Sequence, residues 1–245
     1  MKEKIYTIDI NEAIDEKGFC PFCTLFKKLD YQKVDYTLGP SMMEADFRLV
    51  TNKKGFCARH IREILSRSKA LGTSLILDTH LNEVEDIFNF DLKEDKKKLF
   101  KKGTDKKEEF LSLLEKLNSS CAVCDMVEQT FSRYFETFIY MLKTEDDFLN
   151  KVLDTDGFCI PHFTKLFKIA KDKLSKKEFD KLFYPVMDMQ KQKIVKYHLY
   201  VKEFSESYDY RNVKKEKNFP KDTLYKVSEL LCSEFDPKKK DLNNI

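Results

Sequence analysis

Apolar side chains recur at helical spacing along much of this chain. From residue 127 to 142 they step by three and four positions, which predicts a helix with one buried face; these positions are Val127, Phe131, Tyr134, Phe138 and Leu142. Residues 24–38 have a poorer period, and we expect a helix there as well. The 245 residues include only six glycines, and β-rich folds use glycine in their turns. The sequence therefore predicts a mainly α fold.

The last third of the chain has the pattern of long helices. Ser175 and Glu178 have the spacing of a capping box, which marks the start of a helix. An apolar stripe then continues to Phe204, and we expect Pro185 to break or kink it, because proline has no amide donor. A final amphipathic helix at residues 224–231 either folds back on the body of the protein or offers a partner an apolar face.

A duplicated motif is the most informative feature of the sequence. Each copy contains a Cys-x-x-Cys pair followed later by Gly-Phe-Cys-x-x-His. The Cys-x-x-Cys pairs are offset by 101 positions (20 and 121), and the second motifs by 102 (57 and 159). Six of the seven cysteines and two of the four histidines belong to this scheme. They are Cys20, Cys23, Cys57 and His60 in the first copy, and Cys121, Cys124, Cys159 and His162 in the second.

Three thiolates and one imidazole are a ligand set typical of zinc, which binds four such groups in a tetrahedron. We expect each pair at the start of a helix, where the positive end of the helix dipole favours the thiolate that binds metal. We therefore predict two zinc ions, held by the eight motif residues. An iron–sulfur cluster and a thiol-redox role for Cys20 and Cys23 stay open as alternatives, because thiolates serve both. Buried thiols that only fill a core are disfavoured by the repeated register.

The two ligand pairs of one copy meet only if the chain returns to its starting point. Ser41 with Glu44, and Thr144 with Asp147, have capping spacing and predict a second helix in each copy. A helix of about 15 residues travels roughly 22 Å, and an antiparallel second helix would bring the chain back. An exchanged arrangement, in which the Cys-x-x-Cys of one copy meets the Cys-x-x-His of the other, has the same composition. We favour ligand sets from a single copy, because that hairpin closes a far shorter loop.

Five further residues lie outside the predicted ligand set: two glycines, His80 with its counterpart Gln190, and Cys232. Gly55 and Gly157 stand where a returning helix needs a left-handed residue to stop. His80 corresponds to Gln190 of the second copy; a hydrogen-bonded flank residue is the simpler interpretation, and an acid–base or metal-contacting role is the alternative. Cys232 has no companion at ligand spacing, so we expect it to pack.

The paired Cys-Pro-x-Cys and Gly-Phe-Cys-x-x-His motifs resemble those of an uncharacterised bacterial family, a domain of unknown function. The resemblance extends from Asn11-Glu12-Ala13 through His162 and the helix after it, although Cys121-Ala122-Val123-Cys124 lacks the proline. The family has no assigned activity, so the resemblance implies metal-binding motifs and no substrate.

Charge and hydropathy exclude several classes of partner. The 45 basic and 42 acidic residues leave a net charge of only +3, which is not the signature of a nucleic-acid-binding surface. No apolar run reaches the roughly 18 to 20 residues of a membrane span, and the chain begins with charges where a signal peptide needs an apolar core. We therefore expect a cytoplasmic protein without nucleic-acid or membrane partners, in which the cysteines stay reduced.

These patterns divide the chain by its duplication. We predict a first metal-binding helical module at residues 1–90, a charged connection at 91–109, a second module at 110–210, and a C-terminal helix and tail at 211–245. The chain has no phosphate loop, dinucleotide fingerprint or nucleophile elbow, and a full ligand set leaves no open position of the catalytic kind. The prediction is a protein with structural zinc sites and a binding, scaffold or regulatory role, with a protein partner left open. A metalloenzyme that uses one of the two sites is the alternative.

Overall fold

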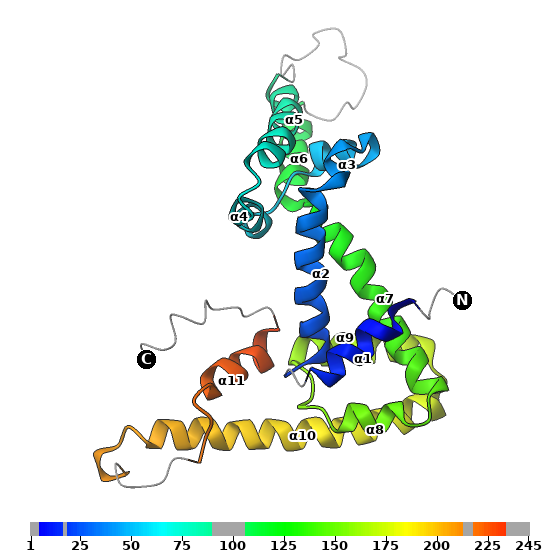
Figure 1. Cartoon of the computed structure of the whole chain (residues 1–245), viewed down its shortest axis with the longest axis vertical. Coiled ribbons are helices and arrows are strands. Elements are labelled where there is room, and N and C mark those ends of the chain that lie inside the picture. The colour runs from blue at the N-terminus through cyan, green and yellow to red at the C-terminus, as the bar shows by residue number, and fades with distance from the viewer. Residues whose placement is uncertain (1–4, 17–18, 90–105, 213–217, 234–245) are drawn as a thin grey trace. The chain divides into compact units, whose positions relative to one another are not determined.

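The computed structural model describes residues 5–16, 19–89, 106–212 and 218–233 (Figure 1). Within these ranges the regular elements are all helices and none is a strand, which confirms the mainly α prediction. The first α-helices are α1 (Thr7–Asp15), α2 (Pro21–Thr37), α3 (Ala45–Lys54), α4 (Ala58–Ser66) and α5 (Ala70–Phe88). They are followed by α6 (Lys106–Ser119), α7 (Ala122–Thr144), α8 (Phe148–Leu153), α9 (Ile160–Lys173), α10 (Lys176–Glu206) and α11 (Thr223–Cys232). Two 3-10 helices are η2 (Pro40–Met43) and η3 (Tyr210–Asn212).

None of the helices in this described part of the chain has both the length and the apolar composition that a membrane crossing requires.

The chain divides into two compact units. Unit 1 contains Met1–Lys27 and Phe131–Ile245, and unit 2 contains Lys28–Thr130. The boundaries fall within α2 and α7, so each of these helices contributes residues to both units. Each unit therefore holds the Cys-x-x-Cys of one copy and the Gly-Phe-Cys-x-x-His of the other. The boundaries predicted from the duplication describe the repeated segments, and they stay a prediction.

Aromatic side chains form the core of unit 1. Phe22 stacks on Phe135, with ring centroids 4.0 Å apart and planes inclined by 14°. Phe138 and Phe158 lie against the same ring, at 5.0 and 5.9 Å, and all four side chains are fully buried. Burial of each such side chain stabilises the fold by about 1.5–3 kcal/mol. Because Phe22 lies within a Cys-x-x-Cys pair, and Phe158 directly precedes a motif cysteine, this core fixes the backbone that carries both.

The longest helix, α10, packs against α8, α9 and α11. It begins at the predicted capping box, in which the Ser175 hydroxyl accepts from the Glu178 amide and the Glu178 carboxylate accepts from the Ser175 amide. The helix continues through Pro185, so of the break and the kink that we expected as alternatives there, the break does not occur. Leu182 and Val186 are buried on either side of the proline, and their packing offsets the roughly 3 kcal/mol that an interior proline costs.

The C-terminal helix α11 folds back on unit 1. It packs against α9 and α10, and its Leu230 is buried. Glu229 forms an ion pair with Lys27 at 3.0 Å. Of the two outcomes that the amphipathic pattern allowed, the structure has the first. Cys232, which we expected to pack, is exposed.

Unit 2 is built around α3 and α5, which pack along each other, with η2, α4 and α6 beside them. Arg48 of α3 donates hydrogen bonds to the carbonyl of Leu75 and the hydroxyl of Thr79, both on α5. Ile64 of α4 and Ile76 of α5 are fully buried. These contacts hold the connection between α3 and α4, in which the first Gly-Phe-Cys-x-x-His lies.

The second helix of each copy exists as predicted but begins later than its capping signal. The proposed N-caps Ser41 and Thr144 use their hydroxyls on the preceding turn, where they donate to the carbonyls of Tyr36 and Tyr140. The caps of α3 and α8 are the acidic residues three positions further on, and neither makes a side-chain capping bond. Because these hydroxyls are directed at carbonyls earlier in the chain, they do not cap the amides of the helix that follows.

Candidate metal centres

The eight motif residues lie in two groups of four, one in each unit. Within each group the donor atoms are all within 4.8 Å of one another. The unit 1 centre consists of Cys20, Cys23, Cys159 and His162, and the unit 2 centre of Cys57, His60, Cys121 and Cys124. Each centre takes one pair from each copy of the repeat. Our preference for ligand sets from a single copy is therefore wrong, and the exchanged arrangement is the one that forms.

Helix lengths explain the exchange. α2 has 17 residues and rises about 25 Å, whereas α3 has 10 and rises only about 15 Å. The mismatch is larger in the second copy, where α7 has 23 residues and α8 has 6, or about 34 Å against about 9 Å. The second helix is too short to bring the chain back to the start of the first.

The loop-closure cost that favoured the local arrangement is small. Cys23 and Cys159 are separated by 136 positions, four times the 34 positions from 23 to 57. Each doubling of a loop costs about 0.6 kcal/mol, so the longer closure costs about 1.2 kcal/mol more. Fixed helix lengths outweigh a term of this size.

All four ligand pairs lie at helix starts, as predicted. Cys57 and Cys159 are the N-caps of α4 and α9 and have extended backbone. Cys20 and Cys121 directly precede α2 and α7, and their carbonyls accept hydrogen bonds from amides of the first turn. The second ligand of every pair follows three residues later, so both side chains lie on the same side of the first turn. Two helix N-termini therefore contribute to each centre, and their dipoles favour negative charge on sulfur.

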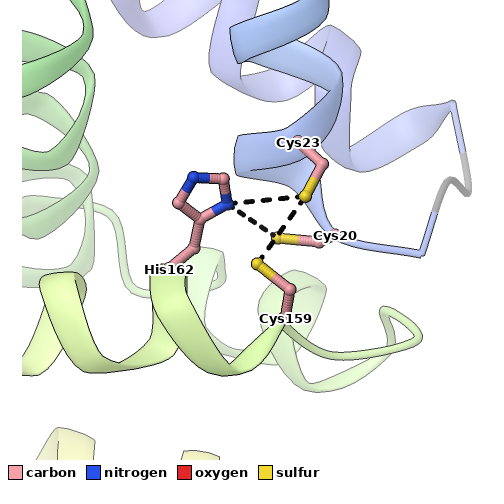
Figure 2. Close-up of side chains that lie close together, drawn as sticks. All are labelled: Cys20, Cys23, Cys159 and His162. Atoms are coloured by element: carbon pink, nitrogen blue, oxygen red, sulfur yellow. Dashed lines mark hydrogen bonds between the residues drawn. The ribbon is translucent and has the colours of Figure 1, made fainter. Parts of the chain in front are cut away.

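Figure 2 shows the unit 1 centre, in which three sulfurs and one ring nitrogen converge. His162 Nδ1 lies 3.6 Å from Cys20 Sγ and 3.5 Å from Cys23 Sγ, and Cys23 Sγ lies 3.6 Å from Cys159 Sγ. Ligand bonds of about 2.0–2.3 Å place tetrahedral donors about 3.5–3.8 Å apart. These distances fit a single ion, and none of the cysteines forms a disulfide.

Apolar and backbone groups enclose the unit 1 centre, and all four of its ligands are buried. Three phenylalanine rings surround the imidazole with centroids 5.2–6.0 Å away; they are Phe131, Phe22 and Phe135. The carbonyl of Ser233, at the end of α11, accepts a hydrogen bond from Cys23 Sγ at 3.3 Å. The C-terminal helix thus covers part of this centre.

The unit 2 centre has the same donors at similar distances. His60 Nδ1 lies 3.1 Å from Cys121 Sγ and 3.4 Å from both Cys57 Sγ and Cys124 Sγ. Cys57 Sγ and Cys124 Sγ are 3.8 Å apart. This centre is more open, because His60 and Cys121 are buried whereas Cys57 and Cys124 are only partly buried.

A carboxylate orients the histidine of the unit 2 centre. His60 Nε2 lies 2.9 Å from Asp30 Oδ1, and Asp30 Oδ2 accepts from Arg59 Nη1 at 2.8 Å. With Nδ1 directed at the sulfurs, Nε2 carries the proton and donates it to Asp30, which is the arrangement that fixes a metal-binding histidine. In the described part of the chain, no carboxylate is hydrogen-bonded to His162.

The pKa values of this pair reflect their contact. Burial raises the pKa of Asp30, but hydrogen bonds from His60 and Arg59 outweigh it and hold that pKa below its usual range. Burial lowers the pKa of His60, but the hydrogen bond to Asp30 outweighs it and raises the pKa to about 9. The sequence alone does not identify Asp30 as a partner of His60. The two residues lie on different helices, 30 positions apart, and no spacing rule connects them.

The thiol pKa values show how charge is distributed in each centre. Burial raises the pKa of Cys121, but the hydrogen bond from His60 outweighs it and lowers the pKa to about 6. Burial and then the charge of Cys121 raise the pKa of Cys124 to about 12. In the unit 1 centre, hydrogen bonds outweigh burial to lower the pKa of Cys20, and hydrogen bonds to neighbouring thiols raise that of Cys23. One thiolate therefore opposes ionisation of its neighbours, and a divalent cation would relieve that repulsion.

The Gly-Phe-Cys turn of the first copy is braced by His80. Gly55 has a φ of +59° and ends α3, as predicted for a residue that stops the helix. His80 Nδ1 donates to the carbonyl of Asn52 at 2.6 Å, and a Cβ added to Gly55 would lie 2.3 Å from His80 Nε2. His80 belongs to neither centre. It is the hydrogen-bonded flank residue of the simpler interpretation.

Gln190 braces the equivalent turn of the second copy. Its Nε2 donates to the carbonyl of Phe158 at 2.8 Å, and its Oε1 accepts from the Phe158 amide at 2.9 Å. Gly157 has a φ of +99°, and a Cβ there would lie 2.9 Å from Gln190 Oε1. The predicted correspondence of His80 and Gln190 is confirmed, because each fills the space beside the motif glycine.

Comparison with protein families matches residues 1–238 to DUF6062, a family of unknown function, and the chain belongs to that family. No match was found among curated proteins or among solved structures. Family membership supplies no activity, so the function has to be argued from the two centres.

Proposed function

We propose that this member of the DUF6062 family binds two zinc ions, one at each centre, and that the ions stabilise its fold. The observation that supports this most is the geometry of the donors. The hydrogen-bonding contacts within the two centres span 3.1–3.8 Å, close to the roughly 3.5–3.8 Å of a tetrahedral zinc site. Three soft sulfurs with one imidazole are also the donor set that zinc commonly takes.

The distances favour one shared ion over an iron–sulfur cluster. In a cluster the four protein ligands are divided between two or four iron atoms, which holds some of them farther apart than a shared ion does, whereas all four donor atoms of each centre lie within 4.8 Å of one another. The sulfur atoms of Cys23 and Cys159 are 3.6 Å apart, and those of Cys57 and Cys124 are 3.8 Å apart. A single ion between them satisfies all four donors of each centre.

The proposed role is structural because each donor set is complete. Four protein ligands leave no position for the water that a catalytic zinc usually activates. Each ion would join a helix start of one copy to a helix start of the other, and apparent zinc affinities of about 10–16 kcal/mol would then be folding energy. We infer a scaffold or regulatory protein of the cytoplasm, the compartment that keeps such thiolates reduced.

Metal analysis of the freshly purified full-length chain tests the proposal. We expect two equivalents of zinc by elemental analysis and native mass spectrometry, no visible absorption, and a loss of helical circular dichroism when a strong chelator removes the ions. Cys121→Ser should reduce the content to one equivalent, and the matched Cys232→Ser, outside both centres, should keep two. Protein without bound metal, or coloured protein containing iron, would contradict zinc binding.

A further inference from the structure

The two centres are unequally protected. Six of the eight ligand residues are buried and two are partly exposed. The two partly exposed residues, Cys57 and Cys124, both belong to the unit 2 centre. In the unit 1 centre the exposed fractions of the three sulfur ligands are 1% for Cys20, 7% for Cys23 and 0% for Cys159. A small reagent therefore reaches thiolates in one centre more easily than in the other.

Differences between the motif copies account for this exposure. Phe22 lies within the Cys-x-x-Cys pair of the unit 1 centre, whereas Val123, a much smaller side chain, takes the equivalent place in the unit 2 centre. The phenylalanine before the next cysteine is fully buried in unit 1 (Phe158) but only partly buried in unit 2 (Phe56). The unit 1 centre is also covered by α11 through Ser233. Apolar cover is thus concentrated on the unit 1 centre.

The two partly exposed thiols are neighbours that come from different copies of the repeat. Cys57 begins α4 and Cys124 lies in the first turn of α7, 67 positions later, with their sulfurs 3.8 Å apart. A disulfide needs a separation of about 2.0 Å. Oxidation of one of the two sulfurs would release it from the ion that they share and let the pair approach, because each lies at a helix start and is only partly buried.

We propose that the unit 2 centre is an oxidation-sensitive switch, in which hydrogen peroxide joins Cys57 and Cys124 as a disulfide and expels the zinc ion. This rests on the proposed zinc binding. The unit 1 centre keeps its ion under the same conditions and holds its unit folded.

The reaction balances as a two-electron oxidation of the thiolate pair. One thiolate sulfur attacks an oxygen of the peroxide, the O–O bond breaks, and a sulfenic acid forms as hydroxide leaves. The second thiolate attacks the sulfenic sulfur, the S–S bond forms, and the S–O bond breaks to release another hydroxide. The two hydroxides become water with protons from the solvent. Zinc leaves because only His60 and Cys121 remain as its ligands.

Titration of the zinc-loaded, full-length Cys232→Ser protein with hydrogen peroxide tests the switch. This variant removes the exposed cysteine that lies outside both centres. We expect release of one of the two zinc equivalents, seen with a colorimetric zinc chelator. The intact mass should fall by two hydrogens, and peptide mapping should find the Cys57–Cys124 disulfide. A thiol reductant followed by added zinc should restore the original mass and metal content.

Matched variants make the outcome decisive. Cys20→Ser in the same background, which disables the unit 1 centre, should still release its remaining equivalent at the same peroxide concentration. Cys121→Ser, which disables the unit 2 centre, should retain its equivalent. Parallel release from both centres, or a disulfide within the unit 1 centre, would overturn the switch while leaving zinc binding intact. Purified protein without zinc would instead refute the proposed function itself.

Discussion

Replacement of Asp30 by alanine tests whether this carboxylate positions His60 for metal binding. The change removes the 2.9 Å hydrogen bond to His60 Nε2 and one acceptor of Arg59. The imidazole then loses the contact that fixes its orientation and places the proton on the nitrogen opposite the metal. Asp30 touches none of the sulfur ligands in this arrangement, so the effect should pass through His60 alone.

The magnitude follows from the role of such partners in other metal sites. Loss of the hydrogen-bond partner of a ligating histidine lowers metal affinity about 10- to 100-fold, which is about 1.4–2.8 kcal/mol. Asp30 contacts the histidine of the unit 2 centre only. The zinc affinity of that centre should therefore fall, and the zinc affinity of the unit 1 centre should stay the same. Chelator competition, which resolves the two equivalents by affinity, measures both at once.

Asp35→Ala is the matched control. Asp35 lies on the same helix, is exposed, and belongs to neither centre. Its replacement also removes an ion pair, because Asp35 contacts Lys69 at 2.7 Å. An exposed pair of this kind contributes little, so both equivalents should keep their affinity. Unchanged affinity in Asp30→Ala, or an equal loss in Asp35→Ala, would refute the positioning role.

Three further predictions concern the turns and the charge of the unit 2 centre. Gly55→Ala places a Cβ against the His80 ring at a φ of +59°, and backbone strain alone costs about 1–2 kcal/mol, so urea unfolding should show a lower free energy of unfolding; an unchanged value contradicts the bracing. Gln190→Leu leaves two buried backbone groups of Phe158 unpaired, at about 1–3 kcal/mol each, so the thermal midpoint should fall, whereas it should not for the exposed neighbour in Gln192→Leu. Without metal, the protonated His60 stabilises the fold fully below its ordinary pKa of 6.5 and loses that effect as pH rises through about 9. Zinc binding displaces this proton, so zinc affinity of the unit 2 centre should rise with pH across that window; a flat chelator-competition profile would contradict it.

The helices and the eight candidate ligands could be predicted from sequence because their signals are local. The predicted stripe on α7 is buried at Val127, Phe131, Tyr134 and Phe138 and partly buried at its last position, Leu142. The i, i+3 ligand spacing likewise matches the first turn of a helix wherever the chain leads afterwards. Spacing, register and burial of one face are properties of a single segment.

The pairing of the motifs could not be predicted, because it depends on where helices end. The exchange follows from α3 and α8 being shorter than the helices before them. Both helices start late because the hydroxyls of Ser41 and Thr144 donate to carbonyls of the preceding turn and do not cap the helix that follows. Pro185 remains within a helix for a similar reason, since packing on both sides of it overrides local propensity. These outcomes are set by competition between local signals and long-range contacts.

The exchanged pairing makes each half of the repeat depend on the other for a complete site. A polypeptide with a single copy of the repeat would contain one Cys-x-x-Cys and one Cys-x-x-His. The lengths of its helices would keep these two ligand pairs apart. Two such polypeptides related by a twofold axis would form two identical sites, each with the Cys-x-x-Cys of one polypeptide and the Cys-x-x-His of the other, as in an isologous dimer. In the present chain the two sites differ in their surroundings: His60 of one site contacts Asp30, and His162 of the other lies against phenylalanine rings.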